Sequence, residues 1–160
     1  MIPGSIATMT EYTSARSADL PQMVELLGML FEQEAEFSPD TQKQKAGIEA
    51  IFSNPALGRF YVAREGKQVV AMASLLFTVS TAEGGKAAWF EDLVVHPEHR
   101  KHGIGAKLLE HVIAQARTEG VLRITLLTDM QNERAQVLYR RLGFTGSPMK
   151  PMRLKLKKKD

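Results

Sequence analysis

One segment near the middle of the chain constrains the fold most, because the spacing of its apolar residues changes twice, from strand-like to helical and back. Ala87 to Val95 is rich in β-forming residues and stops before Pro97, which cannot donate to a ladder. After Gly103, apolar residues follow at helical spacing: Ile104, Leu108, Leu109, Val112, Ile113 and Ala116. This helix is expected to end at Gly120, because glycine is common just past a helix end. Val121 to Leu127 then favours a second strand. The segment predicts a strand, a tight turn, a helix and another strand.

Two helices and a β meander are expected before this segment. Helical spacing of apolar residues predicts a helix over Leu20 to Phe37 with Asp19 as its N-cap, and a weaker helix over Thr41 to Phe52. The meander consists of strands at Phe60 to Ala63, Val69 to Val79 and Ala87 to Val95, with turns at Glu65 to Lys67 and Glu83 to Gly85.

Behind the segment, Glu133 to Leu142 favours a short helix that ends at Gly143, and alternating Met152, Leu154 and Leu156 predict a last strand. The pattern is that of an α/β domain with a mixed sheet of about six to seven strands and about four helices on its faces. Without a repeat or linker, residues 10–160 are expected to form a single domain behind a disordered extension at residues 1–9.

Composition excludes several classes of protein. No apolar run approaches the ~20 residues of a membrane span, and the first ten residues do not resemble a signal peptide. The absence of cysteine excludes disulfides and fits a cytoplasmic protein. The net charge of +3 gathers in a C-terminal run that reads as a solvated chain end: Lys155, Lys157, Lys158 and Lys159. No helix combines a basic face with aromatic residues, so neither a nucleic-acid partner nor a membrane partner is expected.

The turn before the middle helix suits a phosphate group. The first amides of a helix lack intrahelical partners and carry partial positive charge. Glycines at Gly103 and Gly105 let a bulky anion approach them, and Arg100 to His102 add positive charge. The segment has no Gly-Lys-Ser/Thr sequence, and Leu108 stands where a dinucleotide fingerprint needs its third glycine.

The run Arg100-x-x-Gly103-x-Gly105-Ala106, after a strand that ends before Pro97, resembles the acetyl-CoA motif of the Gcn5-related N-acetyltransferases. A second run, from Asn132 to Phe144, resembles the later Asn-x-x-Ala-x-x-Leu-Tyr-x-x-x-Gly-Phe motif of that superfamily. In pattern the chain is nearest to diamine and polyamine acetyltransferases. Asn132 is also explained as an N-cap and Tyr139 as a core residue.

The resemblance implies that acetyl-CoA is the co-substrate and that the sheet splays apart where it binds. The pantetheine arm would pair with the backbone of Leu93, Val94 and Val95. The pyrophosphate would meet the amides of Lys101, His102, Gly103, Ile104, Gly105 and Ala106, with Arg100 nearby. Asn132 and Ala135 belong to the second motif and are further candidates for cofactor binding.

The implied reaction is direct attack by a primary amine in a ternary complex. A lysine-like amine with a pKa of ~10.4 is mostly protonated at neutral pH, so a carboxylate must take a proton, directly or through water. Glu91 is the first candidate for this base and Asp92 the second; the alternative is that both carboxylates pair with arginines or backbone amides. Tyr139 is the candidate acid that protonates the thiolate.

The acceptor is less constrained. A small amine is expected, because Glu91-Asp92 and Asp129-x-x-Asn132 resemble the polyamine enzymes and because an acidic group could attract a cation: Glu32, Glu34 and Glu36. The alternatives are a peptide or protein lysine, or a catalytically silent acetyl-CoA sensor. The hairpin around Glu83 to Gly85 could support a homodimer. His96, His99 and His102 recur at every third position, but Pro97 opposes a shared helical face, so no metal site is expected.

Overall fold

The computed structural model describes residues 9–34 and 37–158, and the chain divides into two compact units, residues 1–127 and residues 128–160. The extension predicted at residues 1–9 therefore lies outside the described residues except for Met9, as do Glu36 and Lys159. No helix among the described residues has both the length and the apolar character needed to cross a membrane.

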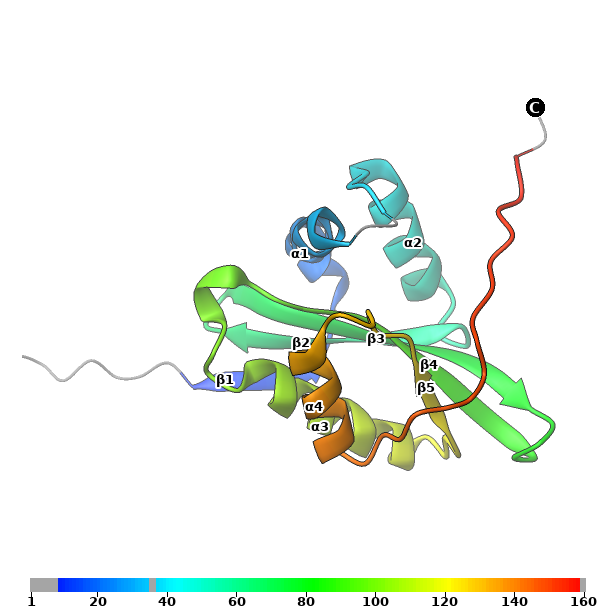
Figure 1. The fold of residues 1–160 in the computed structure, drawn as a ribbon. Helices are drawn as coiled ribbons and strands as arrows, with labels where there is room; N and C mark the ends of the chain where they lie inside the picture. Colours follow the sequence, from blue (N-terminus) through cyan, green and yellow to red (C-terminus); the bar gives the residue numbers. More distant parts are fainter. Residues whose placement is uncertain (1–8, 35–36, 159–160) are drawn as a thin grey trace, which may run out of the picture. The chain divides into compact units, whose positions relative to one another are not determined.

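The first unit is built on a sheet whose strands follow chain order (Figure 1). The strands are β1 (Thr10–Ser14), β2 (Gly58–Glu65), β3 (Gln68–Ser80), β4 (Gly85–Val95) and β5 (Ile124–Leu126). Neighbours from β1 to β4 are antiparallel, whereas β5 is parallel to β4 because α3 crosses between them. The mixed sheet is confirmed, with five strands among the described residues instead of six or seven.

Helices cover both faces of this sheet (Figure 1). The helices α1 (Leu20–Gln33) and α2 (Thr41–Ser53) lie on one face, and α3 (Ile104–Thr118) lies on the other. The turn η1 (Ser17–Asp19) precedes α1, and η2 (Pro97–His99) precedes α3. The helix α1 ends earlier than predicted: its apolar stripe finishes at Phe31, and acidic side chains are unfavourable at a helix C-terminus.

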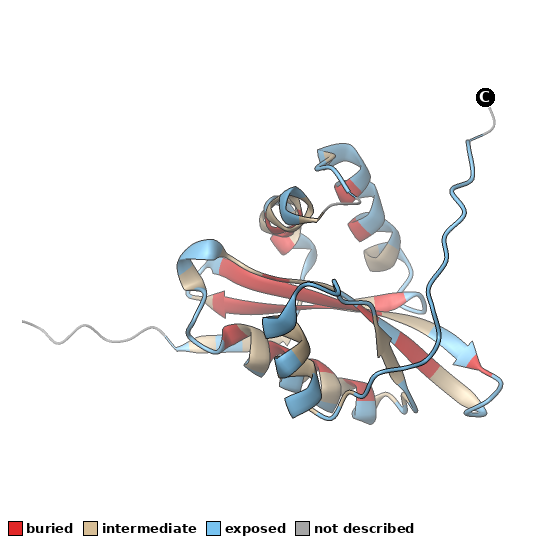
Figure 2. Ribbon diagram, viewed as in Figure 1, coloured by how far each residue is buried: buried red, intermediate tan, exposed pale blue. Residues whose placement is uncertain are grey.

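The core lies between these layers (Figure 2). Strand β3 is buried without a break from Val69 to Leu75, because helices shield both of its faces. One cluster joins α1 and α2 to the sheet and consists of Met23, Leu26, Leu27, Ile48, Phe60, Val62, Val69, Met72 and Val94. Below the sheet α3 buries its predicted stripe, of which Ile104, Leu108, Leu109, Val112 and Ala116 are buried.

Asp19 stands at the N-cap position of α1 as predicted, but its side chain makes no capping hydrogen bond to that helix. Its carboxylate accepts two hydrogen bonds from the Arg64 guanidinium, at 2.7 and 2.9 Å, and one from the Arg16 N–H at 2.8 Å. Arg64 and Asp19 are both buried, so these bonds compensate the cost of removing two charges from water. The hydrogen bonds from Arg64 lower the pKa of Asp19.

The predicted strand at Met152 to Leu156 is absent: this segment of the second unit has no assigned secondary structure, and Met152, Leu154 and Leu156 are 84–90% exposed. An alternating pattern alone does not stabilise a strand, which needs a partner ladder, and the described residues of this unit contain no strand. Strand β5 is also shorter than predicted. The N–H of Val121 bonds to Ala116 O at 3.0 Å and so completes the end of α3 instead of starting a ladder.

Candidate active site

Strand β4 carries a bulge at the two acidic residues. Ser74 on β3 pairs with Glu91, and Met72 pairs with Val94, so Asp92 and Leu93 together oppose a single residue. Asp92 takes up the extra length with a left-handed backbone, φ 56°, which is unusual outside glycine. The Ser74 hydroxyl donates to the Glu91 carbonyl at 3.1 Å and fixes the bulge from the neighbouring strand.

The bulge separates the environments of the two carboxylates. Glu91 is exposed, whereas Asp92 is half-buried. Burial, followed by the charges of Glu91 and of Glu34 beyond the end of α1, raises the pKa of Asp92 to about 7. A carboxyl with this pKa changes its protonation state near neutral pH, as a group that exchanges protons must.

Beyond the bulge one edge of β4 is open. The ladder between β4 and β5 runs only from Ala88–Ile124 to Phe90–Leu126. From Glu91 to Val95, β4 has no partner strand on that side among the described residues, although β3 still pairs on the other side. The ladder therefore ends at the place where the splay is predicted, and Leu93 and Val94 face no partner strand on this side among the described residues.

The open edge leads into the turn before α3. This helix begins after Gly103, whose φ of 75° is left-handed, and no side chain caps it. Its first backbone bond runs from Lys107 N–H to Gly103 C=O at 3.1 Å. The preceding first-turn amides therefore have no intrahelical acceptor, as an anion site requires. A Cβ added at Gly103 meets no protein atom within 4 Å.

The remaining residues of the predicted phosphate site lie on the same turn and in the first turn of α3. Arg100, Lys101, His102 and Gly103 are exposed, Gly105 and Ala106 are half-buried, and Ile104 is buried in the core. Arg100 Nε donates to Val95 O at 3.1 Å, which links the end of β4 to the turn. A Cβ on Gly105 would lie 3.4 Å from Val95, so a glycine lets helix and strand approach closely.

The second unit contains the helix α4 (Glu133–Arg141). Asn132 caps it, because its Oδ1 accepts the Ala135 N–H at 3.1 Å. Tyr139 is half-buried, its ring lies 5.9 Å from that of Phe144, and burial raises its pKa. The phenol consequently keeps its proton at neutral pH. Leu138 and Leu142, interpreted from sequence as core residues, are only half-buried in this unit.

Sequence reasoning missed Ser74 and the bulge. A serine within the apolar run of β3 is a signal for a specific hydrogen bond, but the sequence does not say with which strand. It also missed the backbone of Lys101, whose φ of 69° tightens the turn before Gly103.

Comparison with known proteins identifies the class. Residues 20–144 match the model of the acetyltransferase (GNAT) family. A 5-NmdU N-acetyltransferase from Pseudomonas phage PaMx11 is 30% identical over 115 residues, which are 72% of this chain and 69% of that protein. A glucosamine 6-phosphate N-acetyltransferase from Trypanosoma brucei brucei is 28% identical over 146 residues, 87% of this chain and 90% of that protein.

A solved structure agrees with the fold. A predicted acetyltransferase from Clostridium acetobutylicum, determined with acetyl-CoA, superimposes with a TM-score of 0.74 over 93% of this chain and 96% of its own, at 19% identity. The chain spans 40–46% of the length of three further relatives from rat and cattle. It belongs to the GNAT acetyltransferase family and is an acyltransferase.

Proposed function

We propose that this protein transfers the acetyl group of acetyl-CoA to the primary amine of a small molecule by direct attack in a ternary complex. The observation that carries the proposal is the continuous path from the open edge of β4 to the uncapped first turn of α3. An extended pantetheine arm fits a strand edge, and its pyrophosphate fits helix amides.

In this proposal Leu93, Val94 and Val95 pair with the pantetheine arm, and Lys101 to Ala106 supply the amides for the pyrophosphate. Arg100 adds positive charge. The open space at the Gly103 Cβ position is compatible with this assignment, because it leaves room for an anion beside the first amides of α3. Asn132 and Ala135 remain candidate cofactor residues through the family motif, in which Asn132 also caps α4.

Asp92 is the proposed general base. Its half-buried position and its pKa of about 7 favour it over Glu91, which sequence alone placed first. Holding a lysine-like amine neutral at pH 7.4 costs about 4 kcal/mol. A carboxylate that takes the proton at the bulge, directly or through a water molecule, removes this barrier as the nitrogen attacks.

Bond formation and cleavage then balance. Asp92 takes the ammonium proton and releases it to solvent. The neutral nitrogen then bonds to the acetyl carbon, its second proton passes to Asp92, and the carbon–sulfur bond breaks. Tyr139 is proposed to protonate the departing thiolate, because its raised pKa keeps the phenol protonated. These transfer steps need no metal ion.

A small cationic amine is the proposed acceptor. The charges of Glu91 and Glu34 contribute to the raised pKa of Asp92, so these carboxylates lie close together. The bulge therefore has a negative potential that attracts cations. The name of the trypanosomal relative quoted above denotes a small amine acceptor, an amino sugar phosphate.

The test is release of free thiol from acetyl-CoA in the presence of polyamines, amino acids, amino sugar phosphates and lysine peptides. We expect release with one class of small amine and none without an acceptor. Faster release with lysine peptides would favour a protein substrate. Binding of acetyl-CoA without release on any amine would favour the silent sensor.

A further inference from the structure

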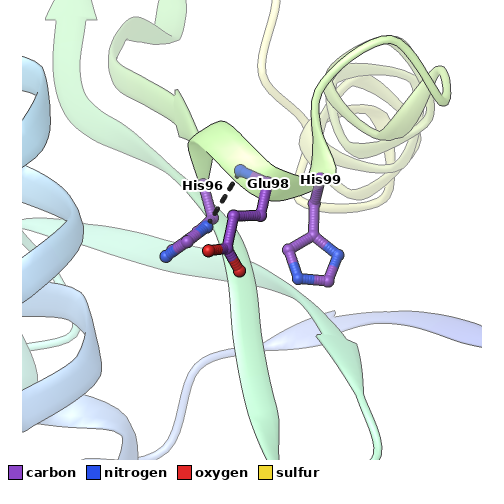
Figure 3. A group of neighbouring side chains, drawn as sticks. All are labelled: His96, Glu98 and His99. Atoms are coloured by element: carbon purple, nitrogen blue, oxygen red, sulfur yellow. Dashed lines mark hydrogen bonds between the residues drawn. The ribbon is translucent and has the colours of Figure 1, made fainter.

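The turn between β4 and α3 gathers three side chains of the types that serve as metal ligands. One ligand atom from each of His96, Glu98 and His99 lies within 4.8 Å of the other two. Figure 3 shows the Glu98 carboxylate between the two imidazole rings. From the sequence, Pro97 opposed a shared site because proline disfavours an α-helix. In the structure Pro97 instead begins the 3₁₀ turn η2, and this tighter turn brings the three side chains together.

The turn is held in this form by its own hydrogen bonds. The His96 N–H donates to Val70 O at 2.7 Å, which anchors the turn to β3, and the His99 N–H donates to His96 O at 2.9 Å. The Glu98 N–H donates to His96 Nδ1 at 3.2 Å, drawn as a dashed line in Figure 3. The bonds from His96 and His99 fix the backbone of the turn that carries the three side chains, whereas the bond to His96 Nδ1 would be exchanged for an ion.

A second, independent observation concerns His99. Its Nδ1 lies 3.2 Å from Glu65 Oε2 at the end of β2, and Glu65 Oε1 accepts the Thr10 hydroxyl at 3.0 Å. The side chains of His99 and Glu65 are only 20% and 26% exposed. In Figure 3 the second ring nitrogen of His99 faces Glu98. A carboxylate on one imidazole nitrogen that leaves the other for a metal is the usual outer-shell arrangement of histidine ligands.

We propose that His96, Glu98 and His99 bind a divalent transition metal ion such as Zn²⁺, with Glu65 orienting His99. Two imidazoles and one carboxylate suit Zn²⁺, Co²⁺ or Ni²⁺, whereas Mg²⁺ and Ca²⁺ prefer oxygen ligands only. The ion binds the lone pair of His96 Nδ1, which otherwise accepts the Glu98 N–H. At least one coordination position of the ion is left for water. The exposed Glu98 leaves the site accessible from solvent.

Titration calorimetry of the chain without an affinity tag, with Zn²⁺ at pH 7.5, tests the proposal. We expect saturable binding of one ion per chain and a Kd at least ~10-fold higher in His99→Ala and in Glu98→Gln. Glu65→Gln should weaken binding by ~10- to 100-fold, as removal of an outer-shell partner does. Co²⁺ titration should show visible absorption bands from nitrogen and oxygen ligands.

His102→Ala is the matched control, because His102 lies on the same turn but outside the cluster. It should bind Zn²⁺ like the wild type. Absence of saturable binding, or an equal loss in His102→Ala, would overturn the site; an unchanged Kd in Glu65→Gln would overturn the role of Glu65. Thermal unfolding without metal confirms that each variant is folded.

Discussion

At the scale of single residues, the proposed chemistry depends on the different environments of two adjacent carboxylates. Glu91 and Asp92 are chemically similar, yet the bulge leaves one exposed and half-buries the other. The sequence could place an acidic pair within the strand that precedes the phosphate-binding turn. It could not order the two, because their order depends on a cross-strand register that no local pattern contains.

Replacing Asp92 by Asn should lower the turnover number by roughly 10²-fold or more, the range typical of a lost general base, with unchanged affinity for acetyl-CoA. Glu91→Gln, the matched control on the exposed neighbour, should cost much less. Steady-state kinetics and calorimetry with acetyl-CoA measure the two effects. Equal losses in both variants would mean that the acidic pair acts through its field and not through one base.

The pH dependence follows from the raised pKa. Asp92 is protonated below its pKa of about 7 and accepts a proton only above it, so kcat/KM should rise as pH increases through that value. Asp92→Asn should abolish this rise. A wild-type profile that rises only near pH 10 would instead reflect titration of the free amine, with a pKa of ~10.4, and would remove Asp92 from the mechanism.

Tyr139→Phe should also lower turnover by roughly 10²-fold, because the phenylalanine ring keeps the packing against Phe144 but has no proton to donate. Acetyl-CoA binding should be nearly intact. Turnover that stays at the wild-type level would mean that water protonates the thiolate.

At the scale of elements, glycine and proline residues predicted several of the ends of helices and strands. The turn at Glu65 to Lys67, the stop before Pro97 and the start of a helix behind Gly103 all agree with the structure. The failures have a common cause. The end of α1, the short β5 and the absent last strand depend on charge or on a partner element and not on local periodicity.

The ion pair of Arg64 and Asp19, which joins β2 to η1, should contribute to stability in a way that depends on its surroundings. Arg64→Met leaves a buried carboxylate without its partner and should destabilise the fold by about 3–5 kcal/mol. The double variant Asp19→Asn/Arg64→Met should lose less. Urea unfolding measures both; a double variant that is less stable than Arg64→Met would contradict the desolvation argument.

The same pair makes the stability of the fold depend on pH, through a lowered pKa and not a raised one as at Asp92. The pKa of Asp19 is lowered in the folded protein, so its stabilisation is present above the unfolded pKa of ~3.9 and is lost as pH falls through the folded value. In acid unfolding, wild type and Asp19→Asn should therefore differ above pH ~4 and converge below it. A constant difference down to the lowest pH would mean that packing, not charge, explains the effect.

At the scale of the whole molecule, the sheet arrangement positions the proposed chemistry. Strand β4 pairs with β5 at one end and is open at the other, and α3 begins directly behind that open end. The sequence predicted this arrangement well through two motifs that resemble the acetyltransferases. It did not predict that His96, Glu98 and His99 come together at η2, because the position of these side chains depends on the type of turn, which their spacing does not determine.

The most direct test of the account is acetyl-CoA binding by Gly103→Val compared with Gly84→Val, measured by calorimetry. Both glycines have a left-handed φ, 75° and 78°, and a Cβ at either meets no protein atom within 4 Å, so the backbone strain is matched. Only Gly103 lies at the proposed pyrophosphate site. We predict that Gly103→Val abolishes measurable binding and that Gly84→Val binds like the wild type. A folded Gly103→Val protein with normal acetyl-CoA affinity would contradict the placement of the site.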